Sequence, residues 1–444
     1  MKRIYILLWL LLPLMAMAQN PLSLEKCIEL AKQNNKRISA AEFQSEAARY
    51  QRRGALSNYL PQFSITGTGL YSTINGALGM EGGLLPVVGA DGIPTGAGAY
   101  FPGINFQYEV DWLYGAGIQV KQPIFTGGKI TAGYKLSKAG ETIALQNRRL
   151  TESEIVVETT RAYATFVRAE DMRKIAISYN ELLKELIRSV EKAMSNGVKT
   201  RNDLLKVEVK LNESELNLLR AKNACRLAAM NLCHYIGTSL DSTIKVSTEL
   251  PATDYAITPS TDITNRPEVQ MLAAKSEAMR QKVKMARAEM LPQIGLVGQY
   301  GYMHGLKLAG NNLFDKWNFA AGVQLSIPII GLGSYSKYRQ AQMNYREARA
   351  EEEDKLGLMT LEVTQAANNL EEAAFEVRLA EKGVTSATEN LRVSSSQYRV
   401  GTETLSDHLE AQTLWLEAEQ TLINARINQF LRWIEYRKVT GAID

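Results

Sequence analysis

The amino-acid sequence predicts an internally duplicated, mixed α/β membrane protein in which each chain supplies four β-strands and two long helical hairpins. Three observations support this fold class. The motif Leu-Pro-Gln, followed by alternating apolar residues, occurs at 60–62 and again 231 residues later. All twelve prolines lie outside the stretches 124–250 and 329–444. A glycine followed by Thr-x-x-Asp-x-Leu interrupts both proline-free stretches, and the two copies are 204 residues apart.

The first 18 residues have the features of a secretory signal peptide. A basic start precedes an apolar run at 4–12, and Ala16-Met17-Ala18 forms a small-x-small cleavage site. The run is too short to cross a membrane as a helix. We expect cleavage after Ala18, which removes two basic residues from a chain whose formal net charge is +4. A mature charge this close to zero argues against nucleic acid as a partner.

No later segment contains the run of about 18 apolar residues that a membrane-spanning helix requires. Any passage through a membrane must therefore use β-strands, because only helices and closed barrels satisfy the backbone in lipid.

The few cysteines and histidines provide no reactive or metal-binding motif. Three cysteines are too few for a disulfide framework, and Cys225 and Cys233 lie eight positions apart on a predicted helix, beyond disulfide reach. We expect these two and Cys27 to be buried free thiols. The three histidines form no motif with the cysteines or acids, and we expect His408 to be a turn residue rather than a ligand. The sequence therefore predicts no enzyme activity, metal or cofactor.

Alternating apolar residues predict two strands in each half of the chain. The first strand runs from 63 to 71 and recurs at 294–302, and the second runs from 117 to 124 and recurs at 322–329. A segment rich in Ala, Glu, Lys and Arg predicts a helix over 24–57, before the first strand.

A glycine-rich segment separates the first two strands. Residues 72–110 include three prolines and carry almost no charge between 76 and 103, so we expect a long loop. Its glycines lack the spacing of a phosphate-binding loop. The counterpart in the second half, 303–315, is much shorter.

Four aromatic residues lie at the loop ends of the predicted strands. Tyr71 and Tyr302 end the first strand of each half, and Trp112 and Trp317 precede the second. Such a distribution is typical of the aromatic belt at a membrane interface. The alternative is a soluble sheet with one solvent-exposed face.

Apolar positions at three- and four-residue steps predict long, coiled-coil-like helices in both proline-free stretches. They span 128–196 and 332–399, about 100 Å each at 1.5 Å per residue. Antiparallel return helices are expected at 201–235 and 403–439. The chain then divides into a signal peptide (1–18), a first repeat (19–237), an inter-repeat linker (238–264) and a second repeat (265–444).

The connection between the two helices of each hairpin has a specific turn chemistry. Gly197 and Gly401 suit the left-handed position after a helix, and Thr404 can cap the helix that follows. Asp203 and Asp407 complement the positive helix end. Because the turn is duplicated, we expect its two copies to lie side by side.

Four strands cannot close a barrel, since about eight is the practical minimum, and an open edge cannot face lipid. Several copies must therefore share one barrel. The order and duplication of these motifs, ending in the turn Tyr-x-x-Gly-Thr-x-Thr-x-x-Asp-x-Leu-x-Ala at 398–411, resemble the TolC family of outer-membrane efflux channels. The resemblance implies a homotrimer with a 12-stranded transmembrane barrel and a periplasmic α-helical barrel. It also implies contact with outer-membrane lipid, a periplasmic adaptor and an inner-membrane transporter.

The resemblance also implies that the two turns form a gate at the periplasmic tip. It assigns gating contacts or acidic rings to Asp203, Tyr398, Asp407 and Glu410, around the turn residues Gly401 and Thr404 and the first-repeat Gly197. The alternative is that the acids only cap helices.

One position departs from the family pattern. Glu403 stands where the best-known member of the family has an arginine that pairs across the closed gate, and Arg399 or Arg201 is the hypothetical substitute.

Three functions are compatible with these sequence features. The first is passive export of small molecules delivered by an inner-membrane pump. The second is the outer-membrane step of a type I protein secretion system, which would use the same tunnel. The third is a periplasmic coiled-coil scaffold without a pore.

Overall fold

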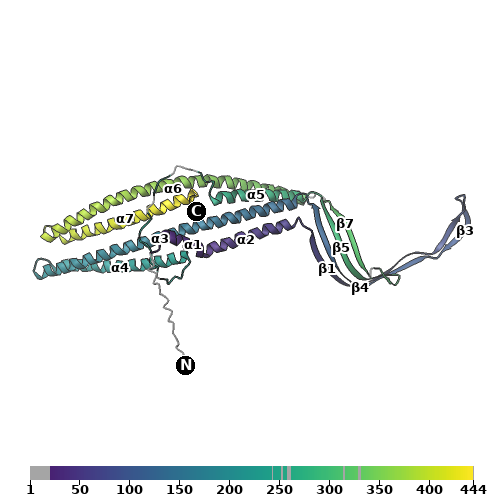
Figure 1. Cartoon of the computed structure of the whole chain (residues 1–444), viewed down its shortest axis with the longest axis horizontal. Helices are drawn as coiled ribbons and strands as arrows, with labels where there is room; N and C mark the ends of the chain where they lie inside the picture. Colours follow the sequence, from purple (N-terminus) through teal and green to yellow (C-terminus); the bar gives the residue numbers. More distant parts are fainter. Residues whose placement is uncertain are drawn as a thin grey trace, which may run out of the picture. The chain divides into compact units, whose positions relative to one another are not determined.

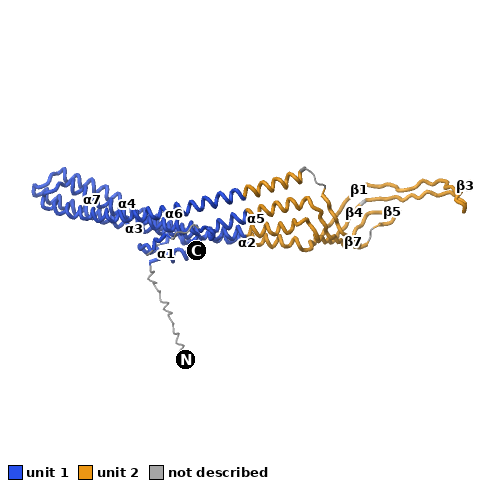
Figure 2. The backbone as a smooth tube through the Cα atoms, turned by 90° about the horizontal axis from the view of Figure 1, so that it is seen from above, with its two compact units in different colours: residues 1–47, 142–275, 349–444 blue, residues 48–141, 276–348 orange. Residues whose placement is uncertain are grey.

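The computed structural model describes residues 21–242, 244–251, 254–257, 262–313, 316–328 and 332–443. The chain forms two compact units (Figure 2). Unit 1 comprises Met1–Ala47, Thr142–Lys275 and Arg349–Asp444, and unit 2 comprises Ala48–Glu141 and Ser276–Ala348. Each unit takes segments from both halves of the sequence. The expected signal peptide lies outside the described residues, as do Ile329 and Asp315 at the ends of two expected elements.

Unit 2 contains an antiparallel sheet built from the four predicted strands (Figure 1). Its long strands are ordered β1-β4-β5-β7, and a two-residue strand, β6, pairs with the end of β5. Successive side chains along a strand point to opposite faces of the sheet, so the alternating apolar residues of each strand lie on one face. The strand bounds are β1 Gln62–Met80, β4 Ile104–Phe125, β5 Gln293–Leu308, β6 Asn311–Asn312 and β7 Trp317–Ser326.

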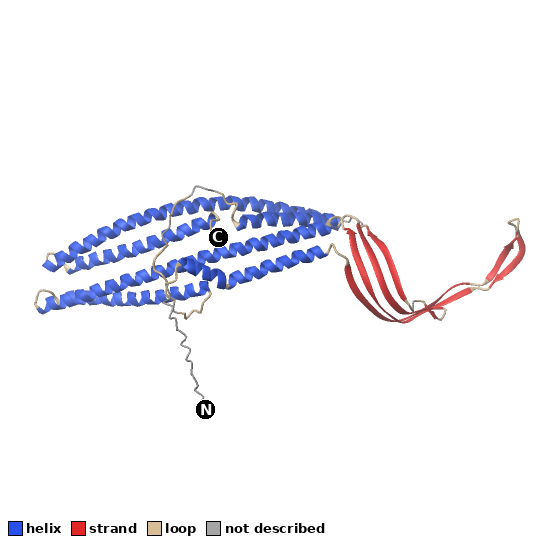
Figure 3. Ribbon diagram, in the orientation of Figure 1, coloured by secondary structure: helices blue, strands red, loops and turns tan. Residues whose placement is uncertain are grey.

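The glycine-rich segment is not the long loop that its composition predicts. β1 continues to Met80 and β4 begins at Ile104, and between them β2 (Gly83–Val88) and β3 (Pro94–Phe101) form a separate two-stranded hairpin (Figure 3). Glycine is compatible with a strand where a large neighbour fills its space. Gly76 is such a case, since a Cβ there would lie 2.6 Å from the hydroxyl of Tyr108, its cross-strand partner.

The helix predicted over 24–57 is interrupted at Asn35. It forms α1 (Leu24–Asn34) and α2 (Lys36–Ser57), and Asn35 between them is extended, with ψ of 124°. The Asn35 side chain donates to the carbonyl of Tyr235 at 3.1 Å and accepts from the amide of Arg37 at 2.9 Å. The side chain thus satisfies an amide at the start of α2 and a carbonyl at the end of α4, as Asn side chains often do at helix ends.

The two long helices have the predicted lengths. α3 (Lys129–Ser195) has 67 residues and α6 (Leu332–Val400) has 69. The return helices are α4 (Arg201–Ile236) and α7 (Leu405–Val439), and α5 (Pro267–Ala288) precedes β5 as α2 precedes β1. None of the helices within the described residues combines the length and apolar character needed to cross a membrane.

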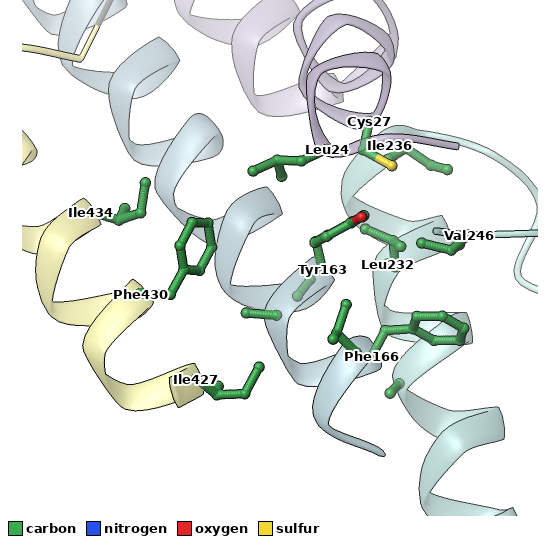
Figure 4. Packing of buried hydrophobic residues seen from close by; sticks show 14 of the residues in the cluster. Leu24, Cys27, Tyr163, Phe166, Leu232, Ile236, Val246, Ile427, Phe430 and Ile434 are labelled. Atoms are coloured by element: carbon green, nitrogen blue, oxygen red, sulfur yellow. The ribbon is translucent and has the colours of Figure 1, made fainter. Parts of the chain in front are cut away.

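The core of unit 1 joins both helical hairpins to α1 (Figure 4). Tyr163 of α3 and Phe430 of α7 are its largest buried side chains, with exposures of 1% and 0%. The Tyr163 hydroxyl donates to the carbonyls of Ser247 and Glu249, at 3.0 and 3.1 Å, and so ties the segment after α4 to α3. This burial of helices from both sequence halves holds the two hairpins in one unit.

The cysteines are free thiols, as predicted, but they differ in burial. Cys27 and Cys233 are fully buried, whereas Cys225 is half-buried and its sulfur lies 3.1 Å from Oε2 of Glu170. Burial and this hydrogen bond raise the pKa of Cys225 to about 11. The expectation of three buried thiols is therefore wrong for Cys225.

Candidate functional site at the helical turns

Both turns end their long helix in the predicted way. Gly197 and Gly401 are left-handed, with φ of 73° and 82°. The amide of Val198 donates to the carbonyl of Ala193 at 2.9 Å, and the amide of Thr402 donates to that of Gln397 at 3.0 Å. These are Schellman caps, which satisfy carbonyls at the helix end and need a residue that accepts positive φ.

Two threonines cap the return helices, and each is hydrogen-bonded to the aspartate three residues later. Thr200 and Asp203 form a capping box, in which the Thr200 amide donates to Asp203 Oδ2 at 3.0 Å and the Thr200 hydroxyl accepts from the Asp203 amide at 3.2 Å. The bond from the Thr200 amide is the main cause that lowers the pKa of Asp203. Thr404 accepts from the Asp407 amide at 3.2 Å, and its hydroxyl donates to Asp407 Oδ2 at 2.7 Å.

Glu410 has a different setting from the two aspartates. It is exposed, six residues after the N-cap Thr404 of α7, and lines a groove of about 490 Å³ together with Lys206 and Lys210 of α4. Its carboxylate is therefore available to ions at the surface, whereas the carboxylates of Asp203 and Asp407 already accept hydrogen bonds from Thr200 and Thr404.

The two turns contact each other through a stack of three side chains. The ring of Tyr398, near the end of α6, lies parallel to the imidazole of His408 in α7, with centroids 4.8 Å apart and an interplanar angle of 5°. Nζ of Lys199, from the turn between α3 and α4, lies 4.5 Å from the centroid of Tyr398. Lys206 of α4 also donates to the hydroxyl of Ser406 at 3.2 Å. The expectation that the turns lie side by side is confirmed.

His408 is held on both ring nitrogens. It is 5% exposed, with Nδ1 2.9 Å from the Ser394 hydroxyl and Nε2 3.0 Å from the Gln412 amide nitrogen. The amide donates, so Nε2 accepts and Nδ1–H donates to Ser394, which is the arrangement of a neutral imidazole. Burial lowers the pKa of His408, and the nearby carboxylate of Glu403 partly opposes that shift.

A shared apolar cluster supports the stack. It draws on α3, α4 and α7, so residues from both hairpins are buried against each other next to the turns. Its fully or nearly fully buried members are Tyr179, Leu183, Leu186, Val190, Leu204, Val207, Leu405 and Leu409.

Glu403, the position that departs from the expected pattern, forms no ion pair with a cationic side chain among the residues that the structure describes. Oε2 of Glu403 is buried without a hydrogen-bond partner among the described residues. Arg399 and Arg201 are exposed, and in the described part of the chain neither forms an ion pair with Asp203 or Asp407. The cation placed between the turns is Lys199, which sequence reasoning missed because its partner lies 199 positions away.

The four predicted aromatic residues meet in pairs across strands. Tyr71 is the cross-strand partner of Trp112, with ring centroids 5.0 Å apart, and Tyr302 is the partner of Trp317, at 6.1 Å. The ladder between β5 and β7 ends at the second pair. Trp112 and Trp317 are each 59% exposed, and Tyr71 is 58% exposed.

The described residues contain no group of His, Cys, Asp and Glu side chains that could hold a metal ion.

A family model described as "Outer membrane efflux protein" matches residues 27–238 and 258–442. The alkaline protease secretion protein AprF of Pseudomonas aeruginosa is 22% identical over 77% of this chain and 72% of its own length. The toluene efflux pump outer membrane protein TtgC of Pseudomonas putida is 22% identical over 94% of this chain and 83% of its own.

Solved structures of outer-membrane channels have the same fold. The Campylobacter jejuni CmeC channel superposes with a TM-score of 0.78 at 20% identity, covering 94% of this chain and 85% of its own. The Vibrio cholerae outer membrane protein VceC superposes with a TM-score of 0.75 at 17% identity, covering 94% of this chain and 96% of its own.

The family match covers most of the chain and confirms the predicted fold class, that of the trimeric TolC-type channels with a periplasmic helical barrel. It also confirms the outer-membrane location and the efflux-channel function. The chain belongs to the outer membrane efflux protein family.

Proposed function

We propose that three copies of this chain form a passive exit duct for small molecules, without enzymatic activity of its own. A periplasmic adaptor connects the duct to an inner-membrane transporter, which supplies the energy. In the described sheet β1 and β7 each have one long partner strand, so each leaves one edge free. Free edges cannot face lipid, and pairing with the neighbouring copy satisfies them.

The strand lengths support a shared barrel. β7 has 10 residues, and the first part of β1, from 62 to the aromatic pair at Tyr71, also has 10. A tilted strand of about 9–11 residues spans a bilayer. We place the aromatic pairs Tyr71/Trp112 and Tyr302/Trp317 at the membrane interface, where Tyr and Trp are favoured.

We assign the gate of the duct to the two turns. It comprises the turn glycines Gly197 and Gly401, the capping pairs Thr200/Asp203 and Thr404/Asp407, and the side chains of Tyr398, Glu410, Lys199 and His408. The contact that supports this proposal most directly is the Lys199–Tyr398–His408 stack, because it joins the first hairpin to the second. Separating the hairpins to widen the tip would break that contact.

The test is conductance of the purified full-length protein in planar lipid bilayers. Tyr398→Ala removes the central ring of the stack and should raise single-channel conductance or open probability. The matched control is Tyr335→Ala, since Tyr335 is 53% exposed near the start of the same helix. If the parent protein forms no channels, the proposed duct is contradicted. If Tyr398→Ala leaves conductance and open probability unchanged, the proposed gate is contradicted.

Protein secretion is the alternative, and the names of two relatives favour it. AprF and the Dickeya chrysanthemi protein PrtF, 20% identical over 70% of this chain, are described as protease secretion proteins. A strain that lacks this protein distinguishes the two functions. Sensitivity to small toxic compounds with an unchanged set of secreted proteins supports efflux, and the reverse pattern supports protein export.

A further inference from the structure

The hairpin of β2 and β3 exposes apolar side chains along its whole length. Leu84 and Tyr100 are each 73% exposed and Ile93 is 63% exposed. Asp91 is the only charged residue between 82 and 103. An isolated two-stranded hairpin is marginally stable in water, and exposed apolar patches mark interaction sites. This hairpin therefore requires a partner that covers it.

Both faces of the hairpin are apolar. Leu84 pairs with Tyr100 on one face, and Leu85 pairs with Ala99 on the other. Phe101, the partner of Gly83, lies on the same face as Leu85 because side chains alternate along a strand. A hairpin with one wet face alternates apolar and polar residues. This one has no polar face, so it needs cover on two sides.

The register places the hairpin beyond the membrane-spanning part of the sheet. β1 continues nine residues past Tyr71 to Met80, which is about 30 Å of strand, before the hairpin begins. If the aromatic pairs mark the interface, the hairpin lies outside the bilayer, at the end of the barrel away from the helices. Lipid tails therefore do not cover it.

We propose that the β2–β3 hairpins of the three copies pack against one another and form an apolar cap at the outer end of the channel. This inference rests on the trimer of the proposed function. In a threefold ring each hairpin has two neighbours, which matches its two apolar faces. A lipid surface or a single foreign protein would cover only one face.

The charge of the hairpin fits self-association. Three copies of a charged hairpin near one axis would repel each other, whereas this hairpin carries one carboxylate. The Asp91 side chain accepts from the amide of Ile93 at 3.2 Å, within the turn and away from the strand pairs. β3 also contains Gly96, Ala97, Gly98 and Ala99, and small residues allow close approach of a neighbouring strand.

The test is disulfide cross-linking of the full-length protein in outer membranes. Leu84→Cys and Leu85→Cys, one on each face, are introduced together with Cys225→Ser, which removes the half-buried native thiol. The control carries Leu84→Cys and Cys225→Ser only, because in the ring the Leu84 face of one copy meets the Leu85 face of the next. Under mild oxidation we expect cross-linked dimers and trimers with both cysteines and monomers with the control.

A second measurement separates this inference from the trimer itself. The mass of the detergent-extracted Leu84→Cys/Leu85→Cys assembly is determined under reducing conditions. A trimeric mass without cross-linked chains would overturn the cap and leave the proposed duct intact. A monomeric mass would overturn the duct and the cap together. If Ala99→Glu, on the same face as residue 85, abolishes the cross-link while the mass stays trimeric, the apolar packing itself is supported.

Discussion

At the residue scale, local chemistry was predictable from the sequence and contacts between hairpins were not. Gly197, Gly401 and the two threonine caps follow from backbone rules that act over five residues, and the structure has them all. The stack on Tyr398 joins residues from two hairpins. Nothing in the spacing of Lys199 and His408 shows that they meet on one ring.

Loss of Lys199 should loosen the contact between the turns. A cation over an aromatic ring at a partly exposed site contributes about 0.5–1 kcal/mol, so Lys199→Ala should raise the open-to-closed ratio about two- to fivefold. Single-channel open probability measures this ratio. Lys192→Ala, at an exposed lysine seven residues earlier in α3, is the control, and an equal effect of both variants would argue against the stack.

Acidification should weaken the same contact. Burial keeps the pKa of His408 below its ordinary value of 6.5, so the unfolded chain binds a proton more readily than the folded one. Stability from neutral His408 is therefore present above pH 6.5 and is lost as the pH falls below it. The charged groups around the stack are Lys199, Asp203, Lys206, Glu403 and Asp407.

The measurement is open probability at pH values from about 7.5 to about 5.5, across the range in which histidine titrates. Parent channels should open more often at the acidic end. His408→Gln, which cannot be protonated, should remove that dependence on pH. A variant that responds to pH as strongly as the parent would assign the response to another group.

At the element scale, the absence of proline and the apolar periodicity fix the four long helices within about two residues. Two features escaped prediction. Asn35 interrupts the first helix because its side chain finds a distant acceptor on Tyr235. The glycine-rich segment forms strands because cross-strand partners such as Tyr108 fill the space above its glycines. Both features depend on contacts between residues far apart in the sequence, and composition does not reveal such contacts.

The turn glycines provide an element-scale prediction. A Cβ at Gly401 would meet no atom within 4 Å, so Gly401→Ala is penalised only by its positive φ, at about 1–2 kcal/mol. Gly357, in the interior of α6 with equally open surroundings, is the matched control. Gly357→Ala should stabilise the helix by about 0.5–1 kcal/mol. Thermal unfolding in detergent should show shifts of opposite sign, and equal shifts would contradict the αL turn.

At the scale of the whole molecule, the number of strands predicts that copies must join, but the sequence does not show how the chain divides into compact units. Unit 1 and unit 2 both combine segments from the two repeats, since equivalent elements of each repeat pack together. The repeat boundaries at 237 and 265 remain a prediction about how the sequence was duplicated.

The acidic residues become important only when three copies meet. Around a narrow axis, three copies of Asp407 and Glu410 should concentrate cations and bind divalent ions. Asp407→Asn with Glu410→Gln removes the charge and keeps at 407 a side-chain oxygen that can accept from the Thr404 hydroxyl. We expect weaker block of single-channel current by divalent cations. Unchanged block would leave Asp407 with only its local role beside the Thr404 cap.

The central claim is that three copies form one hollow duct, and single-particle electron microscopy of the detergent-extracted protein tests it most directly. We expect a threefold hollow particle with a detergent belt around the strands and a helical barrel about 100 Å long, from helices of 67 and 69 residues. A compact monomer, or a rod without a detergent belt, would contradict the claim and favour a periplasmic scaffold.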